Sequence, residues 1–211
     1  CRDLASHYQV AHQPALANDG RTAIDTLDRL FHTHGPPLVL KTDNGSPFVC
    51  AEFLDLLDAW RVIPLLSPPR TPRYNGAAEA GGGALKLRIH YRASDHGHPG
   101  RWTSDDVEAA AQQGNAVLRP WGPRGPTPQE VWHCRPVITP DHRACFIDCV
   151  VAMREQIREE HGMAGEFLSE LPRAAVAREA IRRALIQLGY LLVQRKRISP
   201  PFNSPLWDKI R

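Results

Sequence analysis

The chain has 211 residues, of which 42% are hydrophobic and 23% are charged, and its formal net charge is +3. These values are typical of one well-buried globular domain with an appendage, and they exclude a disordered chain. No apolar run approaches the roughly 20 residues that a membrane-spanning helix requires, so we expect no membrane partner. The slight positive charge is compatible with nucleic-acid binding but does not demand it.

The N-terminal part of the chain begins with a strand pattern and a helix pattern. Residues 7–13 show short polar–apolar alternation, which predicts a strand that Pro14 ends. Apolar residues at helical spacing then predict a helix over 22–34, and Gly35-Pro36-Pro37 stops it.

Two further strands and a helix follow. The apolar run 38–42 predicts a buried strand, and residues 53–60 have the spacing of an amphipathic helix. Residues 62–66 predict a short strand, in which Pro64 favours an edge or a bulge. Strands that alternate with helices predict an α/β fold with parallel pairing.

Residues 67–76 interrupt this pattern with three prolines and a glycine, which exclude regular structure. Arg70, Arg73 and Tyr74 in this loop suit contacts with phosphates and bases. A solvated connector is the alternative interpretation.

A helix is predicted over residues 76–93, where Ala78, Leu85 and Ile89 share one face. The opposite face carries Glu79, Lys86 and His90, so acid and base lie on one stripe. Three consecutive glycines, residues 81–83, each cost about 0.5–1 kcal/mol relative to alanine, so packing must hold this turn.

The rest of the chain predicts helices. One spans 104–118 with Ser104 as its N-cap. Thr127-Pro128 and Thr139-Pro140 are start signals for two more, the second of which reaches about His161. A last helix with a basic face is predicted over 174–188. We place a boundary near residue 139, which divides the chain into residues 1–139 and a basic helical extension, residues 140–211.

The five cysteines show no disulfide framework, which favours a reducing cytosol. One group of side chains invites a zinc interpretation: His133, Cys134, His142, Cys145 and Cys149. Its spacing matches no common structural zinc pattern. Buried cysteines on a helix are the favoured interpretation, because Cys145 and Cys149 are four residues apart beside apolar neighbours.

Two acidic residues lie at the ends of predicted elements, one after a strand and one at the start of a helix. Asp43 follows the strand 38–42, and Glu79 begins the helix 76–93. Two carboxylates at one site repel each other unless a cation is present, and Mg²⁺ or Mn²⁺ prefers carboxylate oxygens. Two such ions can stabilise the attacking and leaving oxygens of a phosphodiester. The pair therefore predicts a metal site for phosphodiester chemistry.

Three sequence features resemble the integrase catalytic core, the family of retroviral integrases and insertion-sequence transposases. They are residues 42–48 (Thr-Asp-Asn-Gly-Ser-Pro-Phe), residues 67–79 (Ser-Pro-Pro-Arg-Thr-Pro-Arg-Tyr-Asn-Gly-Ala-Ala-Glu) and Lys86. The resemblance covers roughly residues 1–135 and is strongest to the insertion-sequence transposases. It implies a ribonuclease H-like mixed sheet flanked by helices, followed by the helical extension.

The resemblance also implies a function. Family members use two aspartates and a glutamate to bind two Mg²⁺ or Mn²⁺ ions, cleave DNA at element ends and join it to target DNA by transesterification. Asp43 matches the second acid and Glu79 the third, as catalytic and metal-binding residues. Asn75 and Lys86 match positions associated with DNA, and we expect Arg70, Arg73 and Tyr74 to contact DNA as well. DNA and a second copy of the chain are the implied partners, in a bacterial cytoplasm near the nucleoid.

The first acid of this set is the missing part. Asp3 is the only candidate, yet residues 3–8 resemble the second strand of the family, where an aspartate need not bind metal. We therefore expect Asp3 to be structural or capping, and the first catalytic aspartate to lie upstream of Cys1. On this interpretation the chain as given does not support two-metal catalysis.

Two alternatives to a recombinase stay open. One is a non-catalytic DNA-binding remnant, and the other is a ribonuclease H-type nuclease. The basic residues of the extension could bind DNA or a partner protomer, or could form a solvated face. They are Arg178, Arg182, Arg183, Arg195, Lys196 and Arg197.

Overall fold

The computed structural model describes residues 1–12 and 20–193. Its longer helices and its strands are α1 (Gly20–His34), β1 (Val39–Thr42), α2 (Ala51–Ala59), β2 (Ile63–Leu66), α3 (Gly76–Asp95), α4 (Ser104–Val117), α5 (Pro128–His133), α6 (Pro140–Glu160) and α7 (Glu170–Gln187). Two short 3₁₀ turns, η1 (Ser46–Phe48) and η2 (Pro72–Asn75), follow the strands. No helix within the described ranges is long and apolar enough to cross a membrane.

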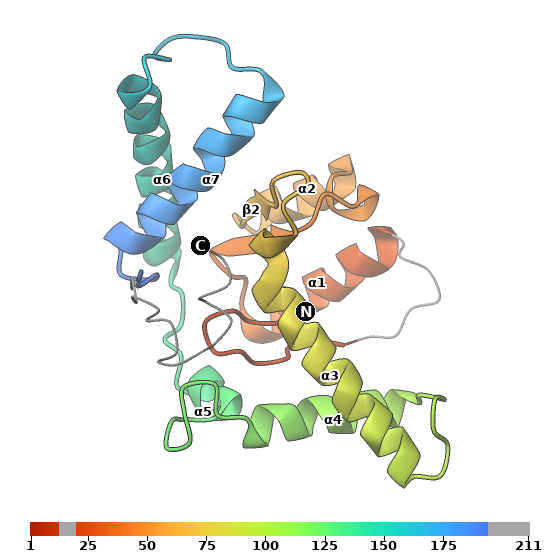
Figure 1. Ribbon diagram of the computed structural model, residues 1–211. Helices are drawn as coiled ribbons and strands as arrows, with labels where there is room; N and C mark the ends of the chain where they lie inside the picture. Colours follow the sequence, from red (N-terminus) through yellow and green to blue (C-terminus); the bar gives the residue numbers. More distant parts are fainter. Residues whose placement is uncertain (13–19, 194–211) are drawn as a thin grey trace, which may run out of the picture.

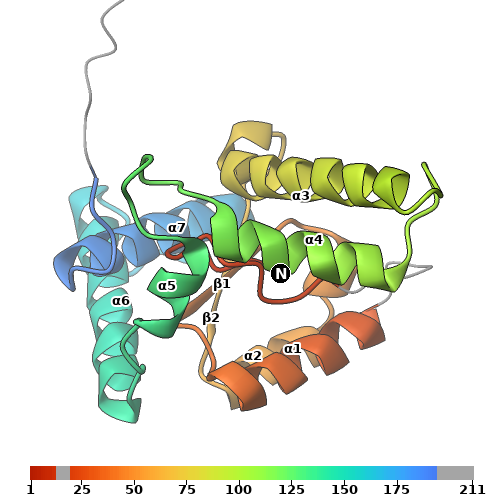
Figure 2. The ribbon, with the colours of Figure 1, turned by 90° about the horizontal axis from the view of Figure 1, so that it is seen from below.

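The centre of the fold is a parallel sheet of two strands (Figure 2). Val39 of β1 lies opposite Ile63 of β2, and Thr42 lies opposite Leu66. Both strands come from the apolar runs that predicted them, so these two predictions are confirmed. Parallel pairing follows from the connection, because α2 carries the chain back to the starting edge.

Helices cover both faces of the sheet (Figures 1 and 2). On one face, Leu40 and Val62 pack with α1 and α2, whose Phe31, Phe53 and Leu57 are buried. Side chains alternate along a strand, so the other face carries Val39, Ile63 and Leu65. There they pack on a cluster from α6 and α7 that includes Phe146, Val150 and Ile181. Residues beyond 139 thus share a hydrophobic core with the sheet, while the domain boundary itself stays a prediction.

Arg143 of α6 connects the segments that precede β1 and β2. Its guanidinium is largely buried and donates to the carbonyls of Pro36 (2.6 Å) and Pro37 (2.7 Å), which precede β1. It also donates to the carbonyl of Arg61 (3.1 Å), which precedes β2. One side chain thus satisfies three carbonyls that precede the two strands.

Helices α3 and α4 form an antiparallel pair beside the sheet (Figure 2). Ile89, Val107 and Ala110 are buried between them. Ala78, which was predicted to share one face of α3 with Leu85 and Ile89, is exposed. The buried position in that turn is Gly81, because a Cβ there would lie 1.9 Å from Nη1 of Arg2.

Arg2 explains the first of the three glycines. Its side chain crosses α3 at Gly81 and donates to the carbonyl of Ala77 (3.0 Å). It also contacts His7, through the carbonyl at 3.2 Å and Nδ1 at 2.6 Å. Glycine at position 81 lowers the helix propensity of this turn but leaves room for the side chain of Arg2. Cβ atoms at Gly82 and Gly83 would meet nothing.

The strand predicted over residues 7–13 does not form in its described part, residues 7–12. Gln9 makes one isolated antiparallel bridge with Arg2. Its backbone N–H and C=O are instead taken by the side-chain amide of Asn115, at 2.8 and 3.1 Å. The mixed sheet that the resemblance implies requires an antiparallel strand, and residues 7–12 do not form one. Gln13 lies outside the described residues.

The helix boundaries confirm most start and stop signals. Gly35 has φ +80°, as expected for a residue that ends α1. Thr127 and Thr139 cap α5 and α6. The N-cap of α4 is Thr103 and not Ser104, because Thr103 and Asp106 form a reciprocal capping box that leaves Ser104 inside the helix.

Two predictions for the C-terminal helices need correction. Cys145 is exposed and only Cys149 packs against the core, so the pair is not buried together. The basic face of α7 is also largely neutralised, because Arg182 and Arg183 both bond Glu179. Arg183 bonds Glu160 of α6 as well, at 2.8 Å. The basic run 195–197 lies outside the described residues.

We expect Arg143→Leu to lower the free energy of unfolding by about 3 kcal/mol, since the carbonyls of Pro36, Pro37 and Arg61 lose a charged donor. Urea unfolding followed by circular dichroism measures the change. Arg124→Leu is the matched control at an exposed loop position, and its stability should stay within about 0.5 kcal/mol of the wild type. Equal losses in the two variants would contradict this role of Arg143.

Candidate functional site

The carboxyl ends of both strands and the start of α3 are joined by one buried side chain. Ser67 follows β2 and is 5% exposed. Its backbone N–H (3.0 Å) and its Oγ (2.9 Å) both contact the carbonyl of Thr42, the last residue of β1. The same Oγ lies 2.7 Å from Oδ1 of Asn75, the N-cap residue of α3. We call Thr42, Ser67 and Asn75 the edge triad.

The edge triad brings the segments of the two predicted acids to the same edge of the sheet. Asp43 is bonded directly to Thr42, and Glu79 lies in the first turn of α3, which begins after Asn75. Both carboxylates belong to exposed residues. Asn44 adds a further link, because its Nδ2 donates to the carbonyl of Ser67 at 2.9 Å.

The Asp43 carboxylate is oriented by its own turn. Its Oδ1 accepts from the backbone N–H of Gly45 at 2.9 Å. A Cβ at Gly45 would lie 2.9 Å from the same oxygen, so glycine leaves the room that this orientation needs. Oδ2 accepts no hydrogen bond from the described residues.

Lys41 and Tyr74 form a second contact between β1 and η2. The ammonium of Lys41 donates to the carbonyl of Tyr74 and lies 4.1 Å from the centroid of its ring. Burial lowers the pKa of Lys41 and raises the pKa of Tyr74. The positive charge of Arg178 on α7 opposes the upward shift of the Tyr74 pKa.

The other predicted DNA-contact residues lie around this edge. Arg70 is exposed in the loop after β2 and has φ +55°. Lys86 is exposed on α3, seven residues or about 10 Å along the helix from Glu79. Arg73 belongs to η2, and its side chain is outside what the structure describes. The roles of these residues in DNA binding stay predictions.

The carboxylate of Asp3 accepts hydrogen bonds within its own turn. Its Oδ2 accepts from the backbone N–H (2.6 Å) and the Oγ (2.5 Å) of Ser6, which is buried. This is the capping role that the sequence predicts for Asp3.

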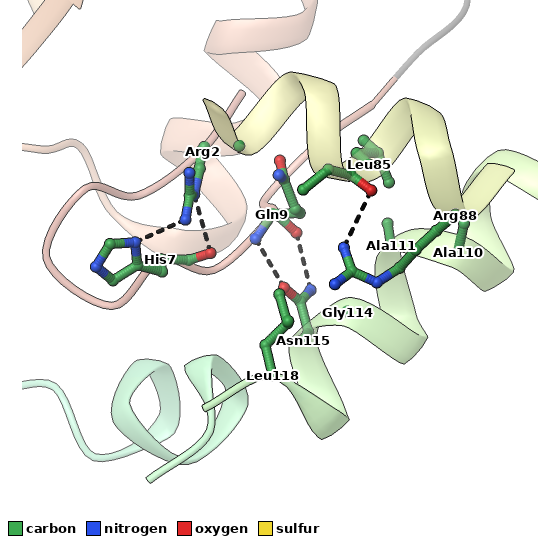
Figure 3. A pocket seen from close by; sticks show the side chains of 12 residues that line it. Arg2, His7, Gln9, Leu85, Arg88, Ala110, Ala111, Gly114, Asn115 and Leu118 are labelled. Atoms are coloured by element: carbon green, nitrogen blue, oxygen red, sulfur yellow. Dashed lines mark hydrogen bonds between the residues drawn. The ribbon is translucent and has the colours of Figure 1, made fainter. Parts of the chain in front are cut away.

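A small cavity lies between the N-terminal segment, α3 and α4, and no residue of the edge triad lines it (Figure 3). Its volume is about 30 Å³, and it is lined by the N-terminal segment, α3 and α4. Its polar groups come from Arg2, Gln9, Arg88 and Asn115. Gln9 and Asn115 bond each other, and the two arginines donate to nearby backbone carbonyls. The cavity has room for about one or two water molecules, so we assign it no substrate.

The predicted metal fits the donors at the edge. Asp43 and Glu79 offer exposed carboxylate oxygens, which are the hard ligands that Mg²⁺ and Mn²⁺ prefer. Such ions keep several waters and complete their coordination with substrate phosphates, so an open edge suits them better than a closed cage.

Sequence patterns did not indicate every residue that positions this site. Ser67 and Lys41 were read as a loop residue and a strand residue, since their partners lie 8 to 33 positions away in the chain. A serine directly after a buried strand and a lysine inside one were the available signals.

No protein-family model and no curated protein matches this chain. Solved structures that are similar to it include the following three. A chain in the cryo-electron microscopy structure of the simian T-cell lymphotropic virus intasome with PP2A regulatory subunit B56 gamma has 21% identity and a TM-score of 0.51, over 60% of this chain and 44% of that chain. The catalytic core domain of BIV integrase has 20% identity and a TM-score of 0.48, over 57% and 75%. The HTLV-2 integrase catalytic core domain in complex with magnesium has 17% identity and a TM-score of 0.44, over 57% and 73%.

The intasome chain, the one similarity of the three above a TM-score of 0.5, shows that this chain has an integrase-like fold. This chain spans less than half the length of that intasome chain. At this level of identity the similarity concerns the fold alone.

We expect Ser67→Ala to lower the free energy of unfolding by about 1–3 kcal/mol, because the carbonyl of Thr42 and Oδ1 of Asn75 lose their contacts with the buried Ser67 hydroxyl. The same variant should weaken Mn²⁺ binding, since the two acid-bearing segments are no longer tied. Urea unfolding and calorimetric Mn²⁺ titration measure the two effects. Ser104→Ala, at an exposed position, is the control and should change neither.

Gly45→Ala should separate metal binding from stability. The added Cβ displaces the Asp43 carboxylate, which is a mobile side-chain end, so the unfolding free energy should change by less than about 1 kcal/mol. The affinity for Mn²⁺ should nevertheless fall by about 10-fold. Gly83→Ala, where a Cβ meets nothing, is the control. Unchanged affinity in Gly45→Ala would contradict the role given to Asp43.

Proposed function

We propose that this chain is the catalytic-core portion of an integrase-like DNA recombinase, with a ribonuclease H-like fold, that acts on DNA phosphodiesters with Mg²⁺ or Mn²⁺. The observation that carries the proposal is the edge triad, because it ties the segments of Asp43 and Glu79 to one edge of a parallel sheet. Ligand sites in α/β folds lie at this carboxyl edge.

Asp43 and Glu79 are proposed to hold the metal. Without a cation their negative charges repel each other, so binding a divalent ion is favoured at the edge where both are anchored. When bound, the ions supply positive charge for the attacking and leaving oxygens of the phosphodiester. The Gly45 N–H keeps the Asp43 carboxylate oriented, which reduces the ordering that binding requires.

The proposed DNA surface surrounds this edge. Arg70, Arg73 and Lys86 offer cations to phosphates, while Tyr74 and Asn75 lie in the turn between them. The positive potential of Arg178 extends the surface onto α7. A second copy of the chain and a bacterial cytoplasmic, nucleoid-associated location belong to the same proposal, by analogy with recombinases of this family.

A second candidate function is a DNA-binding protein without strand-transfer activity. The observation that favours it is the engagement of Asp3, whose carboxylate is used by Ser6. With Asp43 and Glu79 alone, the chain presents two of the three acids of this family. We therefore propose that the 211 residues bind metal and DNA, and that strand transfer needs a further carboxylate.

We expect Asp43→Asn and Glu79→Gln each to weaken Mn²⁺ binding by about 10-fold or more, because each removes one of the two anionic ligands. Isothermal titration calorimetry measures this affinity. Glu52→Gln, at an exposed position in the first turn of α2, is the matched control and should bind Mn²⁺ like the wild type. Duplex DNA binding, measured by fluorescence anisotropy, should decrease steeply between about 50 and 200 mM salt.

The outcomes separate the candidates. Metal-dependent DNA binding that both acid variants lose supports the recombinase core. DNA binding that ignores both variants and the metal supports the remnant. Cleavage of an RNA–DNA hybrid would point to a ribonuclease H-type nuclease. Robust Mn²⁺-dependent strand transfer that Asp3→Asn abolishes would contradict the structural role of Asp3.

A further inference from the structure

A groove of about 320 Å³ lies between α6, the first residues of β2 and the turn that follows α2. One wall is a single face of α6, on which Ile147, Val150 and Val151 are spaced at i, i+3 and i+4. The other wall is formed by residues 62–64. Pockets that bind small molecules begin at about 300 Å³, so this groove is large enough for a small ligand.

The strand wall of the groove has no free backbone donor. The N–H of Val62 donates to the carbonyl of Leu57 at 2.8 Å. That of Ile63 donates to the carbonyl of Leu38 at 3.0 Å, and Pro64 has no N–H. A peptide that adds to a sheet needs such donors, so the groove does not suit strand addition. Polar recognition here depends on side chains.

Three charged side chains line the groove: Asp58, Arg61 and Arg154. Neither guanidinium has a hydrogen bond or an ion pair with a residue that the structure describes. Arg154 is half-buried, and its Nε is buried without a partner. Asp58 is exposed and pairs with neither arginine. The groove therefore combines apolar walls with two cations that the described protein leaves unpaired.

The backbone of Arg61 indicates that its side chain has a use. Helix α2 ends in a Schellman motif, in which the N–H of Val62 bonds the carbonyl of Leu57 and Arg61 has φ +52°. Helices α3, α6 and α7 have a glycine at this position, with φ between +67° and +79°: Gly97, Gly162 and Gly189. Left-handed backbone costs free energy for arginine and not for glycine. Capping of α2 therefore does not explain an arginine here.

We propose that the groove binds a small anion with an apolar body, of the class of aliphatic or aromatic carboxylic acids. Arg61 and Arg154 hold the anionic group, since guanidinium groups bind carboxylates through charge-assisted hydrogen bonds. The apolar body packs on α6, where Val151 is 52% exposed. A merely solvated rim would leave glycine as the better residue at position 61. The site is separate from the sheet edge, because no residue of the edge triad lines it.

The test uses two fluorescent probes, anilinonaphthalene sulfonate and phenylnaphthylamine, which share an apolar body and differ in the anionic group. We expect the sulfonate to bind the wild-type chain at one saturable site. The neutral probe should bind about 10-fold more weakly, because it makes no charge-assisted hydrogen bond. In methyl NMR spectra the sulfonate should shift the resonances of Ile63, Ile147 and Val151 before those of other residues.

Arg61→Gly and Arg154→Gln should each weaken binding of the sulfonate by about 10-fold and leave the neutral probe unchanged. Arg61→Gly should do so without a lower Tm, because glycine suits the positive φ. Arg124→Gln, at an exposed loop position outside the groove, is the control and should bind both probes like the wild type.

Two results on the wild-type protein would overturn the proposal, and neither depends on how the variants fold. One is equal affinity for the charged and the neutral probe. The other is a set of sulfonate-induced methyl shifts confined to residues outside the groove. Unchanged sulfonate affinity in both arginine variants would contradict it as well.

Discussion

The hydrogen bonds of Ser67 are the interaction on which the arrangement of the site depends. One buried hydroxyl contacts the last carbonyl of β1 and the N-cap side chain of α3, and so connects the ends of both strands to the start of α3. A two-stranded sheet has little pairing of its own, since isolated two-stranded units are marginal in water. The edge triad therefore sets where α3 begins relative to β1, and with it the relation between Glu79 and Asp43.

At the N-terminal ends of the strands, the side chain of Arg143 plays a comparable part. Arg143 binds the carbonyls that precede both strands, so α6 is attached to the N-terminal ends of the strands. Ser67 connects their C-terminal ends. Helices on both faces supply the hydrophobic burial that the short strands cannot provide. The carboxyl edge carries the exposed Asp43 and Glu79, and it is where we propose that a metal and a phosphate bind.

The sequence predicted the local elements better than their long-range partners. Strands β1 and β2 and most helices follow from apolar spacing and cap signals, while the roles that motifs give to Asp43 and Glu79 stay predictions. The strand expected at residues 7–12 failed because Asn115, more than 100 residues away, takes the backbone groups of Gln9. The glycine at position 81 likewise depends on where Arg2 crosses α3. Local patterns carry no information on such contacts.

The central claim is that one divalent ion is shared by the segments of Asp43 and Glu79. Paramagnetic broadening by Mn²⁺ tests it most directly, through the backbone amide spectrum of the wild-type chain. At substoichiometric Mn²⁺ the account predicts that the amides of residues 44–46 and of residues 76–80 broaden together and before those elsewhere. Broadening of only one of these two segments, or first broadening at the α3–α4 loop, would contradict it.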